Sequence, residues 1–93
     1  MHSHMFRGKR WVIKRKSIKK RTKFAGTCER PTTPNKTIVL DKDLKEDALL
    51  ETAIHEALHA CLWDLDEETV EDVGRDIARF LRRLNFRLIA GGQ

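Results

Sequence analysis

The sequence of 93 residues has only two cysteines, two prolines and 6% aromatic side chains, and it contains no tyrosine. Two cysteines are too few for a disulfide-stapled secreted domain, and no apolar run approaches the ~20 residues of a membrane span. No apolar stretch follows the basic N-terminus, as a signal peptide would require. These absences exclude a membrane protein and a disulfide-rich secreted fold. We therefore expect one cytoplasmic domain with reduced cysteines and no membrane partner.

Charge is distributed in blocks along the chain. The formal net charge is +5, but residues 7–24 carry ten Lys and Arg and no acid, whereas residues 41–76 carry thirteen acids and three bases. The basic block could bind nucleic acid, or it could cover the acidic block or form a solvated surface. We favour the second interpretation. The nucleic-acid hypothesis depends on these residues: Arg10, Lys14, Arg15, Lys16, Lys19, Lys20 and Arg21.

The N-terminal half of the chain predicts strands. Residues 1–5 resemble a cloning remnant, so we expect one domain over residues 6–90, with a basic β segment at 6–24 and a frayed tail at 91–93. Residues 10–14 and 23–28 are β-prone. Residues 36–40 form the best strand pattern, because they are β-branched and bounded by polar residues.

The C-terminal half predicts two helices, over residues 43–63 and about 66–85. Asp43 and Glu46 have the spacing of a capping box, and Asp66 is placed to cap the second helix. Apolar residues recur at helical spacing in both segments: Leu50, Ile54, Ala57, Leu58 and Cys61, then Val70, Val73, Ile77, Phe80, Leu81 and Leu84. The order predicts an α+β fold: a small antiparallel sheet of about three strands, followed by two helices.

One motif in the first predicted helix carries chemistry. Residues 55–59 read His-Glu-Ala-Leu-His, so His55 and His59 lie one turn apart on one helix face and can reach one cation. Zinc accepts imidazole nitrogen readily. Glu56 lies to one side of the pair and can act on a water instead of binding the metal. The alternative is a pair of histidines on the helix surface with no metal.

A zinc site needs a third protein ligand, which must be a carboxylate or a thiolate because no histidine follows His59. Helix phase favours Glu67, which lies about 90° from the core direction of the second helix. Glu71 is then an acceptor for a histidine N–H or the next candidate ligand, and Glu68 is the third. The full set of candidates is Cys28, Asp64, Asp66, Glu67, Glu68, Glu71 and Asp72.

The arrangement resembles a minimal zincin of the gluzincin type. The pattern Glu67-x-x-Val70-Glu71-x-Val73-Gly74 is similar to the second helix of ImmA/IrrE-like domains, and residues 37–40 stand where such folds place the strand before the active-site helix. The likeness covers residues 36–85. SprT-like proteins are more distantly similar, but they use a third histidine that this chain lacks.

The resemblance implies a zinc-dependent peptidase acting on a peptide or protein substrate. Glu56 would be the general base, and the strand at 37–40 could pair with an extended substrate. We expect narrow specificity, because the chain has no tyrosine and no later histidine to stabilise an oxyanion. The alternatives are a non-catalytic zinc-binding module and a nucleic-acid-binding protein. We expect a monomer or a small oligomer.

Overall fold

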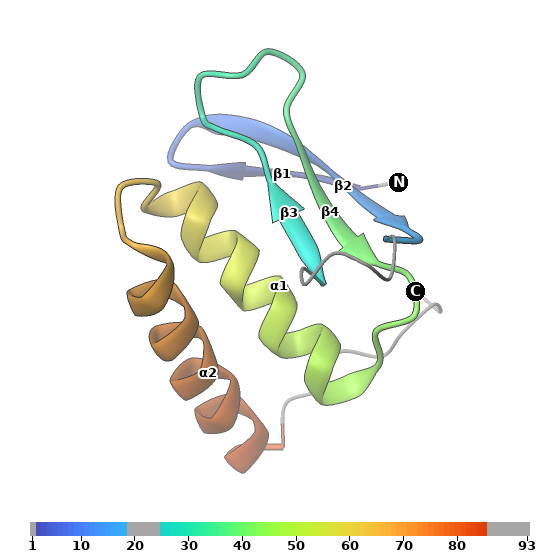
Figure 1. Cartoon of the computed structure of the whole chain (residues 1–93), viewed down its shortest axis with the longest axis vertical. Helices are drawn as coiled ribbons and strands as arrows, with labels where there is room; N and C mark the ends of the chain where they lie inside the picture. The colour runs from blue at the N-terminus through green and yellow to red at the C-terminus, as the bar shows by residue number, and fades with distance from the viewer. Residues whose placement is uncertain (1, 19–24, 86–93) are drawn as a thin grey trace.

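The fold is a four-stranded sheet followed by two helices, seen in a computed structural model that describes residues 2–18 and 25–85 (Figure 1). The strands are β1 (His2–Phe6), β2 (Lys9–Lys16), β3 (Gly26–Cys28) and β4 (Thr37–Asp41). The helices are α1 (Glu46–Cys61) and α2 (Glu67–Arg83). The predicted α+β class is confirmed. The expectations for residues 19–24 and 86–93 lie outside the described residues.

The sheet is mixed, not antiparallel, and its strand order is β1-β2-β4-β3. The hairpin β1–β2 turns through Arg7 and Gly8, which both adopt positive φ. β4 pairs parallel to β2, and β3 pairs antiparallel to β4 at the far edge. Two expectations are therefore corrected: four strands form in place of about three, and residues 2–6 belong to the sheet as β1.

The first helix begins later than its sequence indicates. Lys45 occupies the position before the helix and makes no side-chain cap hydrogen bond, so the expected capping box at Asp43 and Glu46 is wrong. Glu46 has positive φ, and this turn separates it from Asp43. The second cap is confirmed, because the Asp66 carboxylate accepts a 2.7 Å hydrogen bond from the Thr69 amide.

Helix α1 lies between the sheet and α2 (Figure 1). Its sheet side carries Leu49 and Ala60, which join a core that contains the fully buried Trp11. Among the described elements, α2 packs only against α1. Buried Val70, Gly74 and Ala78 form its contact face. The predicted α1 stripe therefore omitted the face that covers the sheet.

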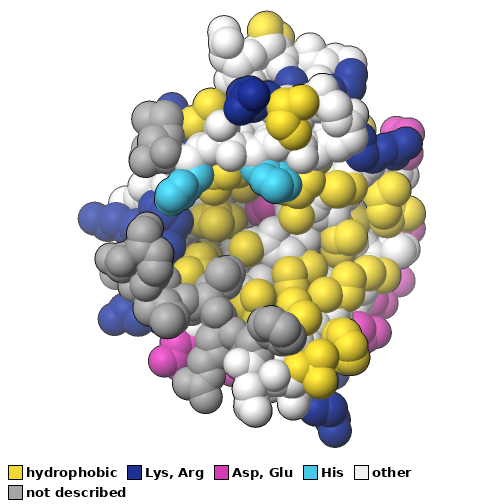
Figure 2. All heavy atoms as spheres, turned by 180° about the vertical axis from the view of Figure 1, so that it is seen from behind, with side chains coloured by type: hydrophobic (Ala, Val, Ile, Leu, Met, Phe, Trp, Pro, Cys, Tyr) yellow, Lys and Arg dark blue, Asp and Glu magenta, His cyan; other side chains and the backbone are white. Residues whose placement is uncertain are grey.

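The face opposite the view of Figure 1 carries a broad group of hydrophobic side chains (Figure 2). Helix α2 and its C-cap residue Leu84 expose an apolar stripe made of Val73, Ile77, Phe80 and Leu84. Neither α1 nor α2 has the length and apolarity that a membrane crossing would require.

Candidate metal centre

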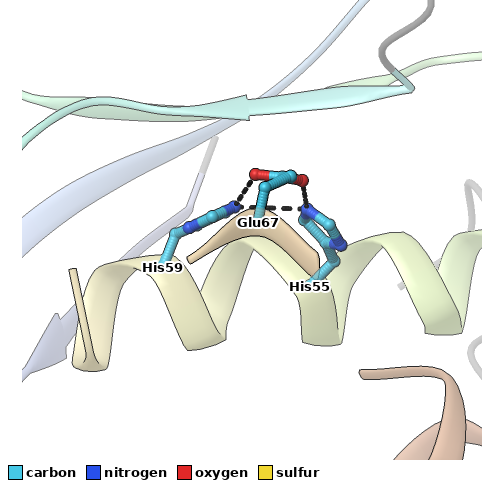
Figure 3. Close-up of side chains that lie close together, drawn as sticks. All are labelled: His55, His59 and Glu67. Atoms are coloured by element: carbon cyan, nitrogen blue, oxygen red, sulfur yellow. Dashed lines mark hydrogen bonds and ion pairs between the residues drawn. The ribbon is translucent and has the colours of Figure 1, made fainter. Parts of the chain in front are cut away.

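Helix α1 presents two histidines to one point in space. His55 and His59 are separated by one helical turn, and their Nε2 atoms lie 3.2 Å apart. Both rings are mostly buried between α1, α2 and β3. Their Nε2 atoms point toward the first turn of α2 (Figure 3). The helical spacing seen in the sequence thus converges on a single site.

Helix α2 supplies a carboxylate to the same point. Glu67 is the first residue of α2, and its position is set by the Asp66 cap immediately before it. Its Oε1 lies 2.7 Å from His55 Nε2, and its Oε2 lies 3.0 Å from His59 Nε2 (Figure 3). Buried Gly74 faces the His55 backbone, where a Cβ would lie in ordinary van der Waals contact at 3.6 Å.

The three side chains form a donor set suited to a metal ion. One ligand atom from each of His55, His59 and Glu67 lies within 4.8 Å of the others. Two imidazole lone pairs and a carboxylate facing one another repel unless a cation or a shared proton lies among them. Tetrahedral zinc ~2.0–2.1 Å from two nitrogens would hold them ~3.3 Å apart. The observed 3.2 Å between the Nε2 atoms fits this geometry.

Glu67 is the carboxylate that lies with the histidines, while the two alternatives lie elsewhere. Glu71 lines a hollow beside the site, but its nearest charged partner is Arg75 at 3.5 Å. Glu68 is exposed on the first turn of α2. Of the other candidates, Asp66 serves as the helix cap and Cys28 lines a hollow next to the group.

Glu56 lies directly beside the donor set and is 5% exposed. Burial, together with the nearby Glu67 carboxylate, raises the pKa of Glu56 to about 7. Gly26 of β3 makes room for this carboxylate, because a Cβ at that position would lie 3.0 Å from Glu56 Oε2 and from the Val39 carbonyl oxygen. A glycine in the edge strand therefore permits a buried acid below it.

The metal-free protein should lose stability as pH rises from about 4.5 to about 7. The pKa of Glu56 rises from 4.5 to about 7 on folding, so in this window the folded state holds a proton that the unfolded state has released. The free energy of unfolding then decreases with pH, by up to about 3 kcal/mol. Urea unfolding of the chelator-treated protein at several pH values measures this decrease.

Glu56→Gln should remove this part of the pH dependence, because an amide does not titrate. Glu71→Gln is the matched control, since Glu71 is an exposed carboxylate near the same site. If the free energy of unfolding depended on pH equally in the wild type and in Glu56→Gln, the pH dependence could not be assigned to Glu56.

Among the described strands, β3 forms the edge of the sheet that runs beside the site. The expectation that residues 37–40 pair with a substrate is wrong, because β4 lies between β2 and β3. The Asp41 amide donates to the Ala25 carbonyl and the Glu29 amide donates to the Thr37 carbonyl. Backbone groups alternate between the two sides of a strand, so those of Gly26 and Cys28 face the open edge.

Two hollows flank the donor set. They share three lining residues: His55, Glu56 and Glu67. One hollow is lined further by Cys28, Trp63 and Leu65, and the other by Glu51, Thr52 and Glu71. The Trp63 ring centroid lies 6.1 Å from that of His59. The sequence interpretation missed Trp63 as a site residue, although its spacing of four from His59 placed it on the same helix face.

Cys28 lines the hollow that also contains Trp63 and Leu65. Burial, with added repulsion from Glu56 and Glu29, raises its pKa to about 12. The side chain is therefore protonated near neutral pH, and its Sγ donates to the Glu29 carbonyl at 3.5 Å. A protonated thiol is a poor zinc ligand.

Two of the basic residues considered for nucleic acid, Arg15 and Arg10, make contacts within the described part of the chain. Arg15 donates to three backbone carbonyls before α1, those of Asp41, Lys42 and Leu44. Arg10 donates to the Ser3 hydroxyl. Lys14 and Lys16 also lie on β2, and Lys19, Lys20 and Arg21 lie outside the described residues. Arg15 thus ties β2 to the loop before α1.

No protein family, curated protein or solved structure matches the chain. Only the residues and their geometry therefore bear on the function of this chain.

Proposed function

We propose that this protein is a zinc-dependent peptidase of narrow specificity. The observation that carries the proposal is the convergence of His55, His59 and Glu67 on one point, with the buried Glu56 beside them. Two histidines and one carboxylate are the ligand set of several catalytic zinc sites, which keep a further position for water or substrate. The hollows on either side of the group give such a position room.

In this proposal His55, His59 and Glu67 would hold the ion. Zinc, when bound, supplies Lewis acidity that polarises a carbonyl and makes a water easier to deprotonate. Glu56 would accept a proton from the attacking water as the water oxygen bonds to the peptide carbonyl carbon. Glu56 would then pass that proton to the amide nitrogen as the C–N bond breaks. A carboxyl group with a pKa near neutrality can both accept and return a proton.

The edge of β3 offers a way to hold the substrate. An extended peptide can pair with the outward backbone groups of Gly26 and Cys28 by β-addition. Because Gly26 lies directly over Glu56, this pairing would place a peptide bond close to the base and to the donor set. Only three residues form this strand, so few backbone hydrogen bonds are available. Side-chain contacts in the two hollows would therefore decide much of the specificity.

The first experiment measures metal content and then peptide cleavage. The full chain is purified without chelator or affinity tag, with His2 and His4 replaced by Gln to prevent adventitious binding. Elemental mass spectrometry is expected to find one zinc per chain, and a mixed peptide library is expected to show discrete cleavage sites. Glu56→Gln should retain the zinc. Its cleavage rate should fall by about 10²–10⁴-fold, which is the range that a general base contributes.

Each outcome of this experiment has a definite meaning. A folded chain without zinc would refute both the metal centre and the peptidase. Stoichiometric zinc without cleavage of any library member would favour the non-catalytic zinc module. Cleavage that is unchanged in Glu56→Gln would show that another group is the base.

A further inference from the structure

The apolar stripe on α2 is separate from the candidate metal centre. Val73, Ile77, Phe80 and Leu84 recur at spacings of four, three and four residues, which is one face of a helix. Phe80 is 60% exposed and Leu84 is 52% exposed. The centre of the stripe lies about 110° around the helix from Glu67. Among the described elements, none packs over it. A contiguous exposed apolar surface on a small domain indicates an interaction site.

The charges of α2 indicate what kind of partner fits this stripe. Acidic residues occupy its first half, whereas basic residues predominate in its second half: Glu67, Glu68, Glu71, Asp72 and Asp76, then Arg75, Arg79, Arg82 and Arg83. A second copy of α2 running antiparallel brings the acidic half of each helix against the basic half of the other. In this antiparallel arrangement the positive end of each helix dipole also lies beside the negative end of the other, which is favourable. A parallel copy would place like charges together.

The stripe also defines a register for the pair. Two antiparallel copies centred between Ile77 and Phe80 place Ile77 opposite the partner's Phe80, and Val73 opposite the partner's Leu84. In this register Arg83 lies opposite position 74 of the other copy, between Asp72 and Asp76 and on the same side of the stripe. Two-fold symmetry produces each of these contacts twice.

The charged residues beside the stripe are available for such contacts. In the described part of the chain, Asp76 and Arg83 take part in no ion pair, whereas Arg75 pairs with Glu71 and Asp72, and Arg82 pairs with Asp47. We propose that the protein forms an antiparallel homodimer through α2.

Sedimentation velocity and light scattering of the full chain over a range of concentrations test the dimer. The expected mass is twice the 10.8 kDa of one chain. Phe80→Glu is expected to give a monomer at all concentrations. Because Phe80 is largely exposed, the variant should fold, and circular dichroism checks this. Met5→Glu is the matched control, since Met5 is 47% exposed on β1, and it should leave the mass unchanged.

Charge reversal tests the register. Asp76→Arg and Arg83→Asp should each weaken dimerisation by about tenfold, because each places like charges opposite one another. The double variant should restore the wild-type dissociation constant. Failure of the double variant to restore it would overturn the register. A wild-type monomer throughout would overturn the dimer, and the stripe would then be covered by another part of the chain or by a different protein.

Discussion

Replacing His59 by alanine is expected to abolish stoichiometric zinc binding and to lower zinc affinity by more than about 100-fold. Substituting a residue that only hydrogen-bonds to a metal ligand already lowers metal affinity by about 10–100-fold, so the loss of a direct ligand should cost more. The same result is expected for His55→Ala and Glu67→Gln, because each supplies one of the three converging atoms. Competition with a fluorescent zinc chelator measures the affinity, and elemental mass spectrometry measures the occupancy.

Glu68→Gln is the matched control for Glu67→Gln, because the two residues are neighbours on the first turn of α2 and are both exposed. It should keep one zinc per chain. If Glu68→Gln lost the metal and Glu67→Gln retained it, the third ligand would be wrongly assigned. Full occupancy in His59→Ala would refute the site as a whole.

Trp11→Ala is expected to lower the free energy of unfolding by about 3–5 kcal/mol. Trp11 is fully buried at the centre of the sheet's core face. The Phe6 ring packs edge-on against it at 5.7 Å, and its indole N–H donates to the Glu29 carbonyl at 3.1 Å. A small domain has ~5–15 kcal/mol of stability in total, so this loss is a large fraction of it.

Urea unfolding followed by circular dichroism measures this effect, and the fluorescence of Trp63 reports on the site in the same variant. Trp11→Phe should cost less, because most of the ring volume remains and only the hydrogen bond is lost. Met5→Ala is the exposed apolar control, because Met5 is 47% exposed on β1, and it should change stability by less than about 1 kcal/mol. If Trp11→Ala lowered the free energy of unfolding by no more than this control does, the central role of Trp11 would be contradicted.

The helices and the histidine pair could be predicted because their signals are local. Helical spacing alone brings His55 and His59 together, and the Asp66 cap could be read from its position before Glu67. Glu67 was the favoured carboxylate, and it is the one that lies with the histidines. The core direction used to choose it was wrong, because Val73, Ile77, Phe80 and Leu84 are exposed and Val70, Gly74 and Ala78 are the buried face. The ligand role itself stays a prediction.

The sheet was harder to predict because its pairing is not local. The parallel pairing of β2 with β4 joins residues 25 positions apart, and no residue in either strand records that partner. As a result, the strand with the strongest pattern, β4, suggests the wrong sheet edge. In the sheet β4 is internal, and the short β3 lies at the edge. Gly26 was read only as part of a possible strand. Its close approach to Glu56 becomes visible only when β3 lies over α1.

Among the described elements, helix α2 packs against α1 alone. The sheet and α1 share a core to which α2 does not contribute. Partial opening of the native state should therefore release α2 first, as the least protected unit in amide hydrogen exchange. Glu67 would leave the histidines in the same event. An ion bound by all three residues would therefore hold α2 against α1 and oppose this opening.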